Sequence, residues 1–398
     1  MQIEELKQLA YEVEDKLGAL FEEVNDFIFR HPELGEKEYI SSKYLVEKIS
    51  EYGFKTTMPY CNLNTAFRAE IGSEGPKIAF LAEYDALPGY GENNDEVAHA
   101  CGHNWIAATT LGTCIVLSKL KEYFNGTIVL IGTPAEETIG CKYDLVNSGA
   151  FDDIDVVFQM HVGAENDINY KALAMDSIEF EFEGVASHAA AYPEKGINAL
   201  DAVNLMFAGI NALRQHVKSD VRIHGIITNG GQAANIVPDK GVCQFYIRAG
   251  ERKYLKEVTE KVINCAKGAA LMTGAKLNYR NFENSFDNII NIPILQSVMK
   301  SNLSNVGISE FTKNEDGPLG STDIGNVSQV CPTMYTEIKL DVEPMVYVHE
   351  KEFLNYINSK EAYDILHKAI KAMATSALEI YLDETLLSEI KSQHSKLV

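Results

Sequence analysis

The sequence predicts an α/β fold of two domains, in which a mixed, largely parallel sheet is interrupted by a smaller inserted domain. Continuous apolar runs at residues 78–82, 127–133 and 156–160 are typical of strands that helices cover on both faces. From about residue 174 the order changes to strand, helix, strand, strand, helix, strand, as in a split-βαβ, ferredoxin-like domain. The first pattern resumes later, so we expect one domain of residues 1–175 and 288–398 and an inserted domain of residues 176–287.

The first domain begins with helices. Apolar residues from Leu6 to Ile28 recur at helical spacing, which predicts a helix that packs one face inward. This helix is expected to stop near His31, because Pro32 disfavours a helical residue before it. The further elements expected here are helices at residues 41–52 and 105–123 and strands at residues 65–70, 77–82, 127–133 and 156–160.

The inserted domain opens with a strand at residues 177–183, whose sequence SIEFEFE alternates as a half-exposed strand does. Its other elements are expected as helices at residues 198–217 and 254–273 and strands at residues 221–228, 241–249 and 276–280. The chain then returns to the first domain with a strand at residues 334–340 and a closing helix at residues 359–382. The polar residues after this helix are expected to be frayed or lightly docked.

Composition and charge narrow the possible functions. The 398 residues are 46% hydrophobic and 23% charged, as in ordinary folded proteins. A formal net charge of -22 argues against nucleic acid or a membrane surface as a partner, because neither attracts an acidic chain. Seven scattered cysteines form no disulfide pattern, the N-terminus lacks the features of a signal peptide, and no apolar run is long enough to cross a bilayer. We therefore expect a cytoplasmic protein.

Side chains of the kind that bind metals follow each of the three apolar runs. They are Glu83 and Asp85 after the first run, Glu136 and Glu137 after the second, and His161 after the third. Ligands of α/β sheets bind at the carboxyl ends of strands, so these side chains are expected to converge on one edge of a parallel sheet. A loop after the first run adds Cys101 and His103, a thiolate and an imidazole that both suit zinc. The sequence therefore predicts a metal site of a hydrolase.

Each of these residues taken alone also has a structural interpretation. Cys101 could be a small buried hydrophobe, His161 a histidine satisfied in the core, and the two glutamates a solvated loop pair. Their joint occurrence after strands of one sheet favours the metal site. Adjacent carboxylates can then divide the work, one binding metal while the other accepts a proton from water. The spacing alone does not decide between them; we assign Glu136 as the base and Glu137 as the ligand.

Several motifs carry a resemblance to a known family. The chain contains, in this order, the motifs EYDALP, HACGHN, GTPAEE, QMH and GVASHAAAYPEKGINALDA. Together they resemble peptidase family M20, above all its amidohydrolase branch, subfamily D. That branch includes aminobenzoyl-glutamate hydrolase-like and N-acyl-amino-acid hydrolase-like enzymes. The resemblance implies two divalent metal ions, zinc or manganese, with the Cys101 thiolate bridging them, Glu136 as general base and Asp85 orienting a ligand histidine. The ligands that it implies are Cys101, His103, Glu137, His161 and His349.

The resemblance extends to the inserted domain, which it implies to be a lid and a dimerisation domain. His188 matches a histidine that polarises the scissile carbonyl, often from a partner subunit, and Asn235 and Arg248 match residues that hold the substrate carboxylate. We therefore expect a homodimer formed through the lid. The loop at residues 317–326 also resembles a family loop near the site, with Asp323 either close to the site or in a turn.

Two positions depart from the family pattern. Asn104 stands where many members of the branch have aspartate, and Glu83 stands where aspartate is usual. Both departures suggest the aminobenzoyl-glutamate or dipeptidase-like side of the branch, and both leave the five ligand positions intact.

The predicted function is metal-dependent hydrolysis of the amide bond in a small N-acyl amino acid, an aminobenzoyl-glutamate-like compound or a dipeptide. One alternative is a cysteine hydrolase with Cys101 as nucleophile and His103 as base, which leaves the glutamates and His161 without a task. Another is a non-catalytic protein that binds small molecules on the same fold, and such a protein has no need of Glu136.

Overall fold

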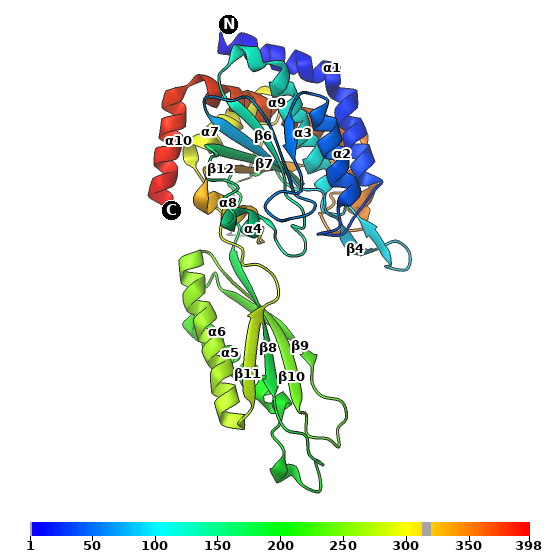
Figure 1. The fold of residues 1–398 in the computed structure, drawn as a ribbon, viewed down its shortest axis with the longest axis vertical. Coiled ribbons are helices and arrows are strands. Elements are labelled where there is room, and N and C mark those ends of the chain that lie inside the picture. The colour runs from blue at the N-terminus through cyan, green and yellow to red at the C-terminus, as the bar shows by residue number, and fades with distance from the viewer. Residues whose placement is uncertain (1, 313–319) are drawn as a thin grey trace. The chain divides into compact units, whose positions relative to one another are not determined.

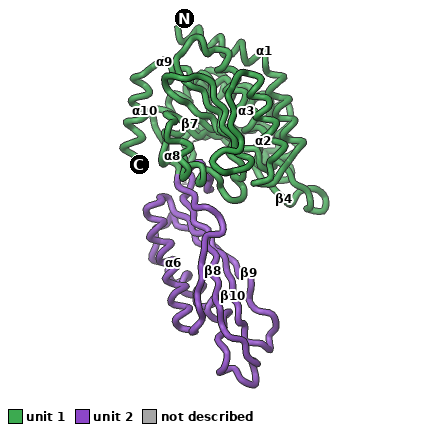
Figure 2. The backbone as a smooth tube through the Cα atoms, in the orientation of Figure 1, with its two compact units in different colours: residues 1–171, 289–316, 326–398 green, residues 172–288, 317–325 purple. Residues whose placement is uncertain are grey.

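The computed structural model describes residues 2–312 and 320–398, which form two compact units (Figure 2). Unit 1 contains the described residues of 1–171, 289–316 and 326–398, and unit 2 contains those of 172–288 and 317–325. These limits differ from the predicted domain limits by a few residues and by the described segment 320–325, which lies with unit 2. The first residues of the loop predicted at 317–326 lie outside the described part of the chain.

Unit 1 is built on a six-stranded sheet. Its strands are β1 (Lys55–Thr57), β2 (Phe67–Ile71), β3 (Lys77–Ala82), β6 (Thr127–Gly132), β7 (Val156–Gly163) and β12 (Thr333–Lys339). The order across the sheet is β1-β2-β6-β3-β7-β12. The last four strands run parallel, whereas β2 is antiparallel to β6 and β1 to β2. The predicted fold class, α/β with a mixed and mostly parallel sheet, is confirmed.

The α-helices of unit 1 lie around this sheet, some packed on its strands and some on other helices (Figure 1). They are α1 (Ile3–Phe29), α2 (Tyr39–Ser50), α3 (His103–Lys119), α4 (Lys142–Asn147), α7 (Pro293–Asn305), α8 (Ile324–Val330), α9 (Lys360–Leu382) and α10 (Glu384–Leu397). Every side chain of α3 from His103 to Leu117 is buried, because the helix contacts α1 and α9 as well as β3, β6 and β7. Trp105 lies in this core, and its Nε1 donates to the carbonyl oxygen of Ala362 in α9. These contacts hold the start of α3 in place.

Two parts of unit 1 refine the expectation. A short antiparallel pair, β4 (Leu87–Tyr90) and β5 (Glu96–Ala98), fills the stretch between the first apolar run and α3. Of the two alternatives for the chain end, frayed or lightly docked, the structure shows the docked one: α10 is capped by Asp383, whose side chain accepts from the backbone of Thr385 and Leu386. Ile390 and His394 are buried in α10. These buried side chains, spaced one helical turn apart, explain why so polar a segment docks on unit 1.

Unit 2 is an antiparallel sheet with two helices (Figure 1). Its elements are β8 (Ala174–Glu183), α5 (Ala199–Leu213), β9 (Arg222–Asn229), β10 (Lys240–Ala249), α6 (Arg252–Thr273) and β11 (Lys276–Asn281), and its sheet order is β11-β8-β10-β9. Phe180, Phe182 and Phe245 lie in a core of its own, with apolar side chains of both helices. The predicted split-βαβ order is confirmed.

Short 3₁₀ helices complete the chain. They are η1 (Lys121–Tyr123), η2 (Pro193–Lys195), η3 (Arg214–His216) and η4 (Glu352–Asn355). None of the described helices combines the length and the apolar composition needed to span a membrane.

Candidate metal centre

The strand order brings the predicted site residues to one edge of the unit 1 sheet. β3 lies between β6 and β7, and all three run parallel, so the residues after β3 and β6 meet beside the end of β7. The prediction that β7 ends at Met160 is wrong, because the strand continues to Gly163 and includes His161. His161 therefore has the fixed backbone of a central strand, which a loop residue would lack.

The loop that carries Cys101 and His103 depends on the glycine between them. Gly102 has a φ of 79°, and a Cβ there would lie 2.4 Å from Cγ1 of Val162. A side chain is therefore excluded, and the left-handed conformation turns the chain directly into α3. His103 is the first residue of α3 and is fully buried.

The five predicted ligands lie in two overlapping groups. The potential ligand atoms of Cys101, His103 and His161 all lie within 4.8 Å of one another, and so do those of Cys101, Glu137 and His349. Cys101 belongs to both groups, which is the position that a bridging thiolate requires. The structure thus brings together five residues that are distant along the chain.

Hydrogen bonds orient the two buried histidines of this cluster. His103 Nδ1 lies 2.7 Å from Oδ1 of Asp85, and His161 Nδ1 lies 2.6 Å from the carbonyl oxygen of Val162. Because Nδ1 of each ring is engaged in a hydrogen bond, each ring turns its Nε2 toward the cluster, as a metal-binding histidine does. The other oxygen of Asp85 accepts from the backbone N–H of Glu137 at 2.9 Å. Asp85 therefore aligns one residue of each group, as an orienting residue would.

The cluster fits divalent ions in its donor atoms and their spacing. Cys101 Sγ lies 3.6 Å from His161 Nε2, and two such atoms bound to one tetrahedral zinc ion are ~3.6 Å apart, from Zn–S and Zn–N bonds of ~2.3 and ~2.0 Å. His103 Nε2 is buried and finds no hydrogen-bond partner among the described residues. Buried polar atoms without partners are rare, and a cation would satisfy this nitrogen.

His349 closes the cluster from a distant part of the chain. Its φ of 70° is left-handed, and its backbone is held by a hydrogen bond from its N–H to Ala100 and by another from the Tyr90 hydroxyl to its carbonyl oxygen. The His349 Nε2 lies 3.2 Å from Oε1 of Glu137, and the His349 side chain is 52% exposed. The cluster therefore runs from the buried His103 to a half-exposed side chain, His349.

This geometry agrees with the comparison of the whole sequence. The chain matches the profile of Peptidase family M20/M25/M40 over residues 79–379, which is more than half of its length. The chain belongs to this peptidase family. It is therefore a hydrolase that acts on C–N bonds, and the family predicted from the motifs is confirmed.

Named relatives of this M20 enzyme act on small substrates. An Xaa-Arg dipeptidase of Mus musculus is 34% identical over 398 residues, which cover 96% of this chain and 89% of that protein. One of the p-aminobenzoyl-glutamate hydrolase subunits of Escherichia coli (strain K12) is 33% identical over 309 residues, covering 74% of this chain and 64% of that protein. A dinuclear metal binding peptidase of the M20 family from Bacillus subtilis has the same fold, with a TM-score of 0.66, 19% identity, and 92% of this chain and 99% of that chain covered.

The environment of Cys101 in this M20 enzyme bears on its chemistry. Burial raises the pKa of the Cys101 thiol well above its ordinary value, and the charge of Glu137 adds to the effect. A nucleophilic cysteine needs a lowered pKa, so that the thiolate forms near neutral pH. A thiol in this position loses its proton when a cation takes the proton's place. The environment thus favours Cys101 as a metal ligand over Cys101 as a nucleophile.

One polar pair at the centre was not predicted. Lys142, the first residue of α4, is fully buried, and its Nζ lies 2.5 Å from Oε1 of Glu83. From the sequence, Glu83 is one of the metal-binding side-chain types after the first apolar run but not one of the five predicted ligands, and Lys142 has no predicted role. A lysine in a short turn after Glu137 normally indicates a solvated charge, so no local signal pointed to its burial.

The predicted lid residues of the M20 enzyme lie in unit 2. The backbone N–H groups of Ala190 and Ala191 point at Nδ1 of His188, at 3.3 and 3.2 Å, so the ring proton belongs on the exposed Nε2. A backbone bridge joins His188 to Ile236, next to Asn235. His188 and Asn235 therefore lie on neighbouring segments.

Arg248 lies at the other end of the unit 2 sheet. It pairs with Met175 at the start of β8, whereas His188 lies beyond the end of β8, which is about 25 Å of extended strand away. Arg248 Nη1 donates to Oγ of Ser321, and its Nε is buried and finds no acceptor among the described residues. Within one chain, Arg248 is therefore too far from His188 and Asn235 to bind the same small molecule.

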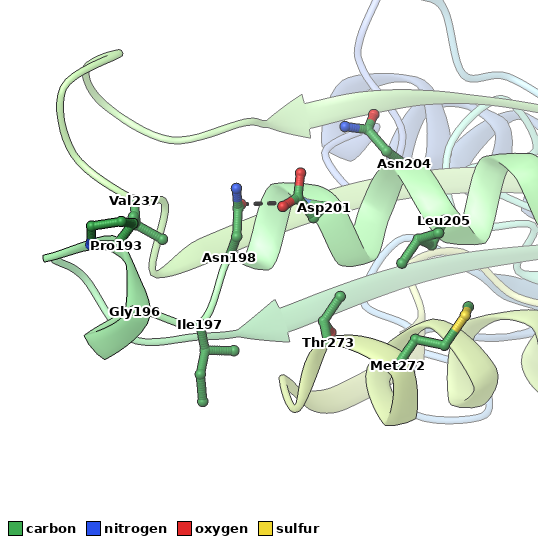
Figure 3. Close-up of a pocket in the computed structure, with 10 residues that line it drawn as sticks. All are labelled: Pro193, Gly196, Ile197, Asn198, Asp201, Asn204, Leu205, Val237, Met272 and Thr273. Carbon is green, nitrogen blue, oxygen red and sulfur yellow. Dashed lines mark hydrogen bonds between the residues drawn. The ribbon is translucent and has the colours of Figure 1, made fainter. Parts of the chain in front are cut away.

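A hollow of about 630 Å³ in unit 2 contains none of these residues (Figure 3). It lies beside the start of α5, and Met272 and Thr273 of α6 line it as well. Among its polar side chains, Asn198 caps α5 by accepting from the backbone of Leu200 and Asp201. The hollow is separate from the residues of the predicted chemistry.

A carboxyl group of β12 near the centre predicts a pH dependence of stability. Burial, with the charges of Asp167 and Glu165, raises the pKa of Glu337 to about 8. The fold therefore holds this proton more tightly than the unfolded chain, whose glutamate pKa is ~4.3. The stabilisation is fully present below that unfolded value and is lost as the pH rises toward 8, with a slope of at most ~1.4 kcal/mol per pH unit.

We expect Glu337→Gln to remove this loss. Urea unfolding of the wild type and the variant at pH 5, 6.5 and 8 measures the difference in the free energy of unfolding. The variant is expected to gain stability relative to the wild type at each step upward in pH. Equal pH profiles for the two proteins would show that Glu337 titrates normally in the fold.

Proposed function

We propose that this M20 enzyme hydrolyses the amide bond of small substrates that end in a free carboxylate, dipeptides above all, with two divalent ions, zinc or manganese, at its centre. The observation that carries the proposal is the pair of ligand groups that share Cys101. The dinuclear centre named for the Bacillus subtilis peptidase of the same fold supports two ions. Five ligands of mixed sulfur, nitrogen and oxygen type suit zinc and also accommodate manganese.

The residues of unit 1 supply the proton transfers. Glu136 has a carboxylate oxygen within 4.8 Å of ligand atoms of His103 and Glu137, so a base lies beside the cluster. When bound, the ions lower the pKa of water and polarise the scissile carbonyl. Glu136 accepts the proton of the attacking water and passes it to the leaving amine, a role that requires hydrogen-bond reach of both.

The residues of unit 2 bind and orient the substrate. The exposed Nε2–H of His188 donates to the carbonyl oxygen on which negative charge develops. The Arg248 guanidinium, with its unpaired Nε, binds the free carboxylate through parallel N–H donors. Asn235 adds an amide close to His188.

The distance between Arg248 and His188 supports a homodimer, because only two chains bring both residues to one small substrate. Unit 2 also exposes apolar side chains and an edge strand, β9, to which a second copy can add. The exposed apolar residues of unit 2 are Val185, Tyr192, Ile226, Ile227, Ile236, Leu271, Met272 and Tyr279.

Among the two substrate types named for the relatives, we propose the Xaa-Arg dipeptide. The Xaa-Arg dipeptidase aligns with 96% of the chain, whereas the p-aminobenzoyl-glutamate hydrolase protein aligns with 74%. A chain with a net charge of -22 attracts the cationic side chain and repels the second carboxylate of glutamate. All seven cysteines are free thiols, which supports a cytoplasmic site of action.

A turnover assay of the metal-loaded protein tests this function with Ala-Arg, Ala-Arg amide, Ala-Glu and p-aminobenzoyl-glutamate. We expect the highest kcat/KM for Ala-Arg and a value ~10–100-fold lower for Ala-Arg amide, which lacks the carboxylate that Arg248 binds. Chelation should abolish turnover, and zinc or manganese should restore it. Turnover that survives complete metal removal would support the cysteine hydrolase instead, and binding without turnover would support the non-catalytic alternative.

A further inference from the structure

Glu83 and Lys142 form a fully buried ion pair next to the metal centre. The side chains of Glu83 and Lys142 are 1% and 0% exposed, and one oxygen of Glu83, Oε1, accepts from Lys142 Nζ. The proposed chemistry uses neither residue. An ion pair in the interior gives little net stability, because desolvation of both charges offsets their attraction. Its presence beside five metal ligands therefore calls for another explanation.

The second oxygen of Glu83 points to that explanation. Glu83 Oε2 is buried and finds no hydrogen-bond partner among the described residues, and the same holds for His103 Nε2, which lies 3.6 Å away. An oxygen and a nitrogen bound to one tetrahedral zinc ion are ~3.4 Å apart, from bonds of ~2.0–2.2 Å. Glu83 Oε2 and His103 Nε2 therefore have the burial and the separation expected of two ligand atoms that bind the same cation.

We propose that Glu83 is a further metal ligand, which reaches the ion of the Cys101, His103 and His161 group from beside His103, and that Lys142 is the residue that positions it. The inference rests on the proposed two-metal function and deepens it. The inner ion then has four protein ligands, the number typical of a closed zinc site. The outer group of Cys101, Glu137 and His349 keeps three, the number typical of a catalytic site with an open position.

Lys142 has two effects in this arrangement. Its hydrogen bond holds Oε1, so that Oε2 alone faces the centre and Glu83 binds through one oxygen. Its ammonium group lies 2.5 Å from Oε1 and gives the buried carboxylate a hydrogen-bond donor and a counter-charge in the metal-free chain. The centre is therefore preorganised for a cation.

The test is the metal content of the double variant Glu83→Gln/Lys142→Met. The double substitution removes the ligand oxygen and its charge partner together, so no unpaired charge remains buried. The matched control is Glu14→Gln, because Glu14 is also 1% exposed and paired with Lys371, but lies in α1 among residues that belong to neither ligand group. Each protein is loaded with zinc and titrated with a competing chelator, and the bound zinc is measured by mass spectrometry. Far-ultraviolet circular dichroism of the metal-free forms tests whether each protein is folded.

We expect two zinc ions per chain in the wild type and in Glu14→Gln. In the double variant the Kd of one of the two ions should rise by ~100-fold or more, because even residues behind the ligands change metal affinity by ~10–100-fold. Two ions bound with unchanged affinity in a folded double variant would overturn the role of Glu83 and leave the two-metal function intact. A wild type that binds neither zinc nor manganese would overturn the proposed function itself.

Discussion

Glu136→Gln is expected to lower kcat by ~10²–10⁴-fold, the usual contribution of a general base. Glutamine keeps the size of the side chain and its hydrogen-bonding capacity but cannot accept the proton of the attacking water. Because Glu137, the neighbouring residue, is the predicted ligand, the variant should hold as much metal as the wild type. The loss should appear in kcat, with KM nearly unchanged.

Steady-state turnover of Ala-Arg together with zinc analysis separates the two adjacent glutamates. Glu137→Gln serves as the matched control, because it removes a predicted ligand oxygen and should lose metal as well as turnover. If Glu136→Gln loses metal while Glu137→Gln keeps it, the two assignments are reversed. Turnover of Glu136→Gln at the wild-type rate would mean that the base lies elsewhere.

Lys142→Met is expected to lower the free energy of unfolding of the metal-free chain by ~3–5 kcal/mol, the usual effect of breaking a buried ion pair from one side. Methionine fills most of the space but leaves Glu83 without its counter-ion at 1% exposure. The effect is large because no solvent reaches the pair.

Urea unfolding in the presence of a chelator measures this loss without any contribution from bound metal. Lys371→Met provides the comparison, since Lys371 bonds Asp15 and Glu14 with a side chain that is 19% exposed, and its loss should be smaller. The double variant Glu83→Gln/Lys142→Met should recover most of the stability. A loss below ~1 kcal/mol for Lys142→Met would show that the pair is not desolvated as the structure indicates.

Much of the fold and of the centre could be predicted because each signal was local. Continuous apolar runs indicate parallel strands covered on both faces, and polar residues directly after such strands indicate a site at their carboxyl ends. Those two arguments bring Cys101, His103, His161 and the pair Glu136 and Glu137 to one edge of the sheet, but they do not decide which glutamate is the ligand. His349 lies in a loop without a strand signal, so only its motif in the family resemblance pointed to it.

Other features depend on distances that no local pattern contains. The partnership of Glu83 and Lys142 joins residues 59 positions apart along the chain, and the burial of a lysine is the opposite of what its residue type suggests. The separation of Arg248 from His188 follows from the register of β8 and β10. The docking of α10 follows from two buried side chains, Ile390 and His394, in an otherwise polar segment.

The central claim is that side chains from distant parts of the chain hold two divalent ions at one edge of the sheet. A crystal structure of the zinc-loaded protein, with anomalous diffraction recorded at the zinc absorption edge, tests it most directly. We predict two anomalous peaks in unit 1, both within bonding distance of Cys101 Sγ. Peaks at other sites, or no peak in fully loaded crystals, would contradict the claim.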